Sequence, residues 1–170
     1  MITIGNNARI SIDGEQSNFL VYELVAPEIY LKWGVRAIRY VQEPLIRAAQ
    51  FLRGETGLPI TVCNYKAGGP YKDSGTRSLE SYMRMCGAEK GVERYLDTYS
   101  MHKFCGALDL KIGDLSSHEM ADLIRKYENI LINMGIRRIE NPEKTKGKVR
   151  DWLHMDTAIT GLDYIVQVNP

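Results

Sequence analysis

The stretch 100–110 most constrains how this chain can fold, because it brings two metal-binding side chains to the start of one strand. Residues 107–112 alternate apolar with small or polar side chains, a pattern typical of a strand. Asp109 would then lie on that strand and His102 in the loop before it, with Gly106 allowing a tight bend between them. Histidine and aspartate are both zinc ligands, and a catalytic zinc usually has three protein ligands and one open position. The stretch therefore predicts two ligands and requires a third from elsewhere.

A second predicted strand, residues 149–155, supplies the third candidate. Side chains alternate across a strand, so Trp152, His154 and Asp156 are expected to share one face. If His154 lies on the sheet face used by Asp109, the chain brings together two histidines and a carboxylate. Asp156 is a candidate for orienting a ligand histidine from behind. The same ligand set also suits transition metals other than zinc.

The remaining elements follow from the spacing of apolar residues and from turn-forming residues. One helix is predicted to begin at Pro44 and to end at Gly54 or Gly57. A second is predicted over residues 116–134, with a capping box at its start and Gly135 as its C-terminal cap. Strands are predicted where short β-branched or alternating segments lie between turns: 58–64, 107–112, 136–140, 149–155 and 162–168.

The chain divides into a short polar beginning and one domain. Residues 1–18 are turn-rich and predict an N-terminal arm or hairpin, and residues 19–170 predict a single domain of ordinary size. Residues 65–99 are predicted to be largely irregular, with one or two helical turns near 79–86. Long loops in compact domains are usually functional or disordered, and this one leads directly into the stretch 100–110, which favours function.

Charge and hydropathy argue against two classes of partner. The net charge is +1 and basic residues are interleaved with acidic ones, so neither nucleic acid nor an anionic membrane is an expected partner. No run of apolar residues is long enough to span a bilayer, and the first residues lack the pattern of a secretory signal. The three cysteines are widely spaced, which predicts free thiols rather than disulfides or zinc ligands.

Three short patterns, in this order and with compatible spacing, resemble a family of zinc peptidases. That family is the superfamily of the zinc D-Ala-D-Ala carboxypeptidases and the Hedgehog-type zinc domain, and the similarity is greatest to its short phage-associated branch. The resemblance covers roughly residues 19–158. The patterns are Ser74-Gly75-Thr76-Arg77, Ser100-x-His102-x-x-x-Gly106-x-x-Asp109 and Trp152-x-His154-x-Asp156.

The resemblance implies a fold and a set of roles. The implied fold is α+β, with a small, mainly antiparallel sheet, helices packed on one face and zinc on the other. His102, Asp109 and His154 would bind Zn²⁺. Arg77 would hold a substrate carboxylate or stabilise the oxyanion, because its planar guanidinium suits contacts with two oxygens at once.

The general base is the point at which this sequence departs from the family pattern. Many members carry glutamate three residues before the last histidine ligand, and the residue here is Asp151, which has one methylene fewer. In a regular strand Asp151 would also point away from the face of His154, unless a bulge brings it round. Glu140, on the neighbouring strand of the predicted hairpin, is the second candidate. A base must reach the attacking water at hydrogen-bonding distance.

The resemblance implies a zinc-dependent metallopeptidase that hydrolyses peptidoglycan stem peptides. The bond would be of the D-Ala-D-Ala carboxypeptidase type or the L-Ala-D-Glu endopeptidase type. A phage or prophage origin is expected, with the protein in the cytoplasm of the bacterial host and released by lysis or carried on a virion. The alternative is a weakly active or inactive zinc-binding module that assembles with phage structural proteins.

Overall fold

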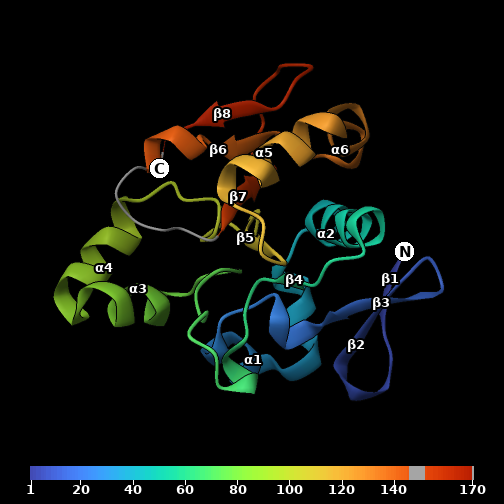
Figure 1. Ribbon diagram of the computed structural model, residues 1–170. Coiled ribbons are helices and arrows are strands. Elements are labelled where there is room, and N and C mark those ends of the chain that lie inside the picture. The colour runs from blue at the N-terminus through green and yellow to red at the C-terminus, as the bar shows by residue number, and fades with distance from the viewer. Residues whose placement is uncertain (146–151, 170) are drawn as a thin grey trace.

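The computed structural model describes residues 1–145 and 152–169 and has an α+β fold (Figure 1). The strands are β1 (Ile2–Ile4), β2 (Arg9–Ile12), β3 (Glu15–Leu20), β4 (Ile60–Thr61), β5 (Ala107–Ile112), β6 (Arg138–Glu140), β7 (Leu153–Asp156) and β8 (Val166–Val168). The helices are α1 (Pro27–Trp33), α2 (Glu43–Thr56), α3 (Leu79–Cys86), α4 (Ala88–Asp97), α5 (Ser117–Lys126) and α6 (Glu128–Met134). None of the described helices is long and apolar enough to cross a bilayer.

The central sheet has five strands in the order β4-β5-β7-β6-β8. Its neighbours are antiparallel except β6 and β8, which run parallel. The sheet is therefore mainly antiparallel, as predicted. The predicted hairpin forms between β6 and β7, and the last strand joins the sheet edge as β8.

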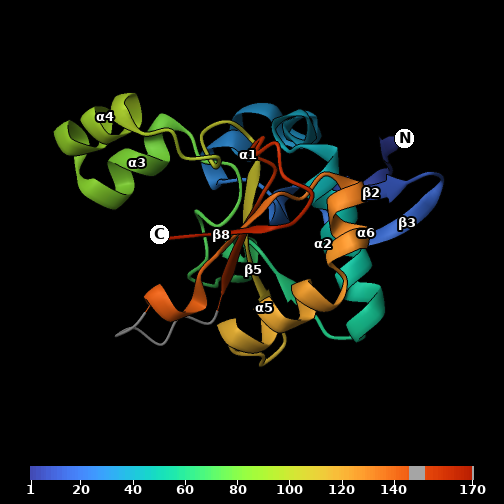
Figure 2. The same cartoon turned by 90° about the horizontal axis from the view of Figure 1, so that it is seen from above.

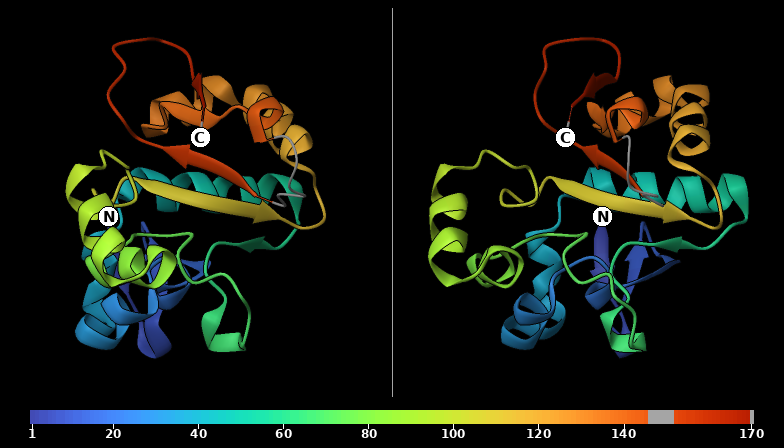
Figure 3. Two further views of the ribbon diagram at one scale, coloured as in Figure 1. Left: turned by 90° about the vertical axis from the view of Figure 1, so that its left-hand side faces the viewer. Right: turned by 60° about the vertical axis from the view of Figure 1, so that its left-hand side comes forward.

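The two faces of this sheet differ in chemistry because side chains alternate along each strand. One face carries buried apolar residues that belong to the hydrophobic core: Leu108, Leu110, Ile139, Leu153 and Met155. Helices α2 and α5 contact β5 and β7, and Figure 3 shows α2 running along β5. The other face carries the polar residues between them, including Asp109, Glu140 and His154. All the candidate ligands on strands thus share the face that the core does not use.

The N-terminal residues form a separate antiparallel sheet in the order β1-β2-β3. Strands β2 and β3 make a hairpin whose turn is Asp13–Gly14, where Gly14 has a φ of 93°. Ile10 and Phe19 are buried in one hydrophobic core cluster together with apolar residues of α2 and α5, the helices that cover the large sheet. Strand β3 runs through residue 18, so the polar beginning continues into the packed structure rather than ending before it.

Two helical predictions need correction. The segment 116–134 is two helices, α5 and α6, because Tyr127 leaves the helical conformation (φ −108°, ψ 20°). The segment 65–99 is less irregular than predicted, since it contains α3 and also α4, which is amphipathic but mostly exposed. Figure 2 shows that α3 and α4 form a hairpin projecting from one side of the molecule. Helix α2 and its left-handed cap at Gly57 agree with the sequence.

Candidate metal centre

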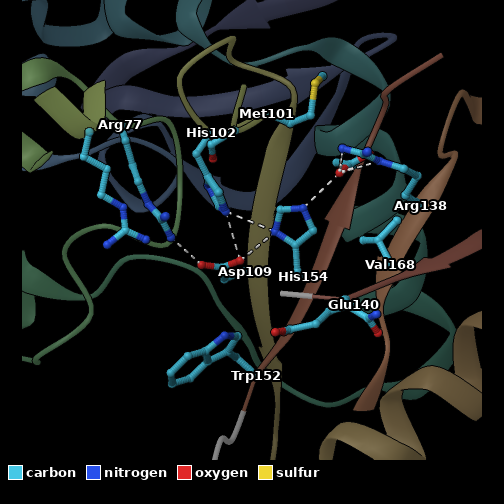
Figure 4. Close-up of a pocket in the computed structure, with 13 residues that line it drawn as sticks. Arg77, Met101, His102, Asp109, Arg138, Glu140, Trp152, His154 and Val168 are labelled. Carbon is cyan, nitrogen blue, oxygen red and sulfur yellow. Dashed lines mark hydrogen bonds and ion pairs between the residues drawn. The ribbon is translucent and has the colours of Figure 1, made fainter. Parts of the chain in front are cut away.

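Three side chains converge on the polar face of the sheet, as the sequence predicted (Figure 4). Strands β5 and β7 pair with Asp109 directly opposite His154, and the loop before β5 brings His102 to the same place. His102 Nε2 lies 3.0 Å from Asp109 Oδ1 and 3.1 Å from His154 Nδ1. His154 Nδ1 lies 3.0 Å from the same Asp109 oxygen. Three ligand atoms thus form a nearly equilateral triangle.

The outer nitrogen of each imidazole determines what the inner nitrogen offers. His102 Nδ1 lies 2.8 Å from the carbonyl oxygen of Gly75, and His154 Nε2 lies 3.0 Å from Asp156 Oδ2. Both partners are acceptors, so the outer nitrogens carry the hydrogens and donate them. A neutral imidazole has one donor and one acceptor nitrogen. The inner nitrogens of neutral rings therefore present lone pairs to each other and to the Asp109 carboxylate.

Three lone pairs that point toward one another in this way fit a small divalent cation. Three lone pairs at this separation repel one another unless a proton or a cation lies between them. Tetrahedral zinc with nitrogen and oxygen ligands at its usual bond lengths separates neighbouring ligand atoms by about 3.3 Å. The observed separations of 3.0–3.1 Å approach this value, so only a small opening of the triangle is needed.

The pKa shifts of the three groups indicate which one holds a proton when no metal is bound. Burial lowers the pKa of His154, but hydrogen bonds to Asp109 and Asp156 outweigh this effect and raise the pKa to about 9. For His102 burial is the largest effect, and it lowers the pKa. Burial raises the pKa of Asp109, but the two histidines and Arg77 hold that pKa well below its usual range. His154 is thus the group whose proton a metal must displace.

The affinity for metal should consequently rise with pH, whereas the stability of the metal-free protein should fall. The folded-state pKa of His154 exceeds its ordinary value of 6.5, so its stabilising contribution is complete below that value and is lost as pH rises through about 9. Binding should release about one proton and tighten about tenfold per pH unit from about pH 7 to about pH 9. Metal titrations and denaturant unfolding of the metal-free protein across this range check both trends. A pH-independent affinity would contradict this assignment.

The loop 74–77 holds two of the ligands in place through its backbone. The carbonyl of Ser74 accepts from the Asp109 amide at 2.7 Å, and the carbonyl of Gly75 accepts from the His102 ring. The Arg77 amide donates to the carbonyl of His102 at 3.0 Å. This loop lies against the chain at Leu24, where a Cβ on Gly75 would fall 2.1 Å from a backbone oxygen. Only glycine fits there, which explains the glycine in the Ser-Gly-Thr-Arg pattern.

Replacing Gly75 with alanine should therefore displace the loop and disturb the metal centre. We expect a loss of about 1–3 kcal/mol in the free energy of unfolding, as for other overpacked sites. Zinc affinity should also fall by about 10–100-fold, because the His102 ring loses its outer partner. Calorimetric zinc titration and denaturant unfolding measure the two effects. Gly54→Ala is the control, since a Cβ at Gly54 meets nothing within 4 Å.

Arg77 lies where it contacts a ligand. Its Nη2 donates to Asp109 Oδ2 at 2.7 Å, and its Nε donates to the carbonyl of Asp73. The guanidinium therefore orients the carboxylate whose other oxygen belongs to the triangle. Its predicted contact with substrate stays a prediction, although the residue does line the pocket in front of the triangle.

Asp156 takes the position predicted for an orienting residue. It is fully buried, accepts from His154 Nε2 and binds the guanidinium of Arg138 through both carboxylate oxygens. Strand pairing places Arg138 opposite Asp156. Sequence reasoning missed Arg138, although the alternation along 136–140 puts it on the same face as Glu140 and could have found it.

Of the two candidate bases, the structure describes only Glu140. Asp151 lies outside the described residues. Glu140 is 5% exposed and lines the pocket. Strands β6 and β7 pair Ile139 with Met155, so the next pair in this register joins Glu140 to His154. Asp109, His154 and Glu140 thus lie side by side on three neighbouring strands, and Figure 4 shows the Glu140 side chain extending into the pocket near His154.

The pocket in front of the triangle has a volume of about 570 Å³. Trp152 lines it, as expected of a packing residue beside the site, and so does Arg94 of α4, which sequence reasoning did not single out. The bend before β5 differs from the prediction. Cys105 takes the positive φ of 65°, and Gly106 is a place of close packing, where a Cβ would lie 2.4 Å from Met101 Cε, the end of a flexible side chain. The three cysteines are free, as predicted.

Comparison with known proteins gives no match: no family description, no curated protein and no solved structure matches this chain.

Proposed function

We propose that this protein is a zinc-dependent peptidase that hydrolyses peptide bonds in peptidoglycan stem peptides. The observation that carries the proposal is the triangle of His102 Nε2, Asp109 Oδ1 and His154 Nδ1, with both rings oriented by acceptors behind them. A triangle of three protein ligands leaves a fourth tetrahedral position facing the pocket. This is the ligand count of catalytic rather than structural zinc sites.

Bound zinc would supply Lewis acidity, by lowering the pKa of a coordinated water and polarising a carbonyl oxygen. The chain's own residues supply the remaining functions. Glu140 is the favoured base because the register of β6 and β7, continued by one pair, puts it opposite His154, and cross-strand neighbours have Cβ atoms about 4.5–5.5 Å apart. Glu140 takes a proton from the attacking water and transfers it to the leaving nitrogen as the C–N bond breaks.

The positively charged residues around the site have separate roles in this proposal. Arg77 orients Asp109 and stabilises the negative charge that develops on the carbonyl oxygen. Arg138 and Asp156 hold the His154 ring so that its inner nitrogen faces the triangle. Peptidoglycan as substrate, and a phage or prophage source, rest on the resemblance to the zinc D-Ala-D-Ala peptidases.

Hydrolysis of purified peptidoglycan tests the proposal. The zinc-loaded protein should release new amino groups, and protein treated with a chelator should release none. Arg77→Ala should lower the rate because it removes a partner of Asp109. If the protein binds zinc but frees no amino groups from peptidoglycan of several chemotypes, the enzyme proposal fails. The non-enzymatic assembly module is then the better account.

A further inference from the structure

The pocket in front of the metal centre contains a guanidinium whose charge no described residue of the pocket balances. Among the described residues, three arginines line it: Arg77, Arg94 and Arg138. Arg77 is paired with Asp109, and Arg138 with Asp156. Arg94 makes no ion pair with any residue that the structure describes, and its side-chain hydrogen bond within that part of the chain is a weak contact of 3.6 Å with the Cys86 sulfur. Its guanidinium is thus able to bind an anionic group of a ligand.

The hairpin of α3 and α4, which carries this arginine, is closely packed. The two helices approach so closely that a Cβ on Gly91 would lie 2.4 Å from Met83 Cα. The rings of Tyr82 and Tyr95 pack edge to face across the hairpin, with centroids 5.5 Å apart. Arg94 lies in the last turn of α4, between Gly91 and Tyr95.

Contacts at the start of α3 fix the hairpin to the rest of the molecule. Ser78 caps the helix and donates its hydroxyl hydrogen to Glu28 of α1 at 2.8 Å. Arg84 donates to the same carboxylate at 3.0 Å and also pairs with Asp73. Because Asp73 and Arg77 belong to one segment, the hairpin is linked to the loop that holds the metal ligands. The position of Arg94 relative to the triangle is therefore set by packing.

We propose that Arg94 binds a carboxylate of the substrate, so that the enzyme selects peptides carrying a free carboxylate next to the scissile bond. This inference rests on the proposed peptidase function and adds a specificity-determining residue to it. Glu140 on β6 and Arg94 on α4 line the same pocket as the triangle. In such a peptide the carboxylate and the leaving nitrogen belong to the same residue, so Arg94 would bind the leaving group while Glu140 protonates its nitrogen. Arginine suits this task because its fork can donate two parallel hydrogen bonds to one carboxylate.

Two carboxylates of a stem peptide have this chemistry. One is the terminal carboxylate of an acetylated peptide ending in D-Ala-D-Ala, and the other is the α-carboxylate of the γ-linked glutamate in an L-Ala-γ-D-Glu peptide. Each can be prepared as the free acid and as the matching amide. Calorimetric titration of the zinc-loaded protein with the four peptides shows which of the two carboxylates is bound. The measurement does not require turnover.

We expect one acid to bind wild type at least about tenfold more tightly than its amide. Arg94→Ala should weaken binding of that acid by about tenfold and leave binding of the amide unchanged, and Arg94→Lys should restore part of the loss. Lys90→Ala is the matched control, because Lys90 is a cation of the same helix that does not line this pocket. Zinc affinity should be the same in all four proteins.

The outcomes separate this inference from the proposed function. If wild type binds acid and amide alike, binds neither, or keeps its preference in Arg94→Ala, the carboxylate subsite is overturned. If wild type prefers the acid through Arg94 but hydrolyses no peptide, the subsite stands and the peptidase proposal fails. If hydrolysis follows the same preference, kcat/KM for the acid should fall in Arg94→Ala in parallel with its affinity.

Discussion

Replacing His154 with alanine should abolish both stoichiometric zinc binding and peptide hydrolysis. The substitution removes one corner of the triangle and leaves Asp156 buried without its imidazole partner. Loss of an outer partner alone typically costs 10–100-fold in affinity, so loss of a ligand should lower zinc affinity by at least about 1,000-fold. Competition of the purified variant against a chromophoric chelator measures the affinity, and release of amino groups from peptidoglycan measures the activity.

The chain contains a matched control for this substitution. His118 is its third histidine, lies exposed near the start of α5 and is not part of the metal-binding group. His118→Ala should bind zinc and hydrolyse peptides as wild type does. If His118→Ala lost zinc to the same degree, or if His154→Ala kept one tightly bound zinc per chain, the assigned ligands would be incorrect.

Replacing Glu140 with glutamine should separate metal binding from catalysis. The amide is nearly isosteric with the carboxylate but cannot accept and pass on a proton, so kcat should fall by about 100–10,000-fold while zinc stays bound. Single-turnover hydrolysis of a synthetic stem peptide, with metal content measured on the same sample, tests both parts. The rise of kcat with pH that deprotonation of this base produces should also be lost.

Glu143→Gln is the control for Glu140, because Glu143 is an exposed acid a few residues further along that does not line the metal pocket. It should leave kcat and zinc content unchanged. Near-normal turnover in Glu140→Gln would remove Glu140 from the mechanism and return the role of base to Asp151. Loss of zinc along with activity would instead mean that Glu140 acts by holding His154 in place.

The convergence of His102, Asp109 and His154 was predictable from sequence because each residue belongs to a short local pattern. Alternation along 107–112 and 149–155 determines the strand face on which Asp109 and His154 each lie. In the structure the two residues pair directly across β5 and β7. Helix α2, the capping box of α5 and the hairpin of β6 and β7 are local features of the same kind. Such features depend on residues close together in the chain.

The parts that sequence did not predict depend on contacts between distant segments. Gly75 is needed because the backbone at Leu24 passes against it, and no local pattern reveals that approach. Helix α4 has few buried residues, so its periodicity gave a weak signal, and the place of Arg94 at the pocket follows only from tertiary packing. The contact of Arg77 with Asp109 likewise joins distant segments, and no local pattern predicts it.

X-ray absorption at the zinc edge, on protein loaded with one equivalent of zinc, tests the central claim most directly. The account predicts four light ligand atoms at about 2.0–2.1 Å, with the multiple-scattering signature of two imidazoles, and a spectrum that changes in His154→Ala but not in His118→Ala. A shell containing sulfur at about 2.3 Å would place the metal on cysteine instead. That result, or a spectrum of hydrated zinc without imidazole, would contradict a metal centre formed by His102, Asp109 and His154.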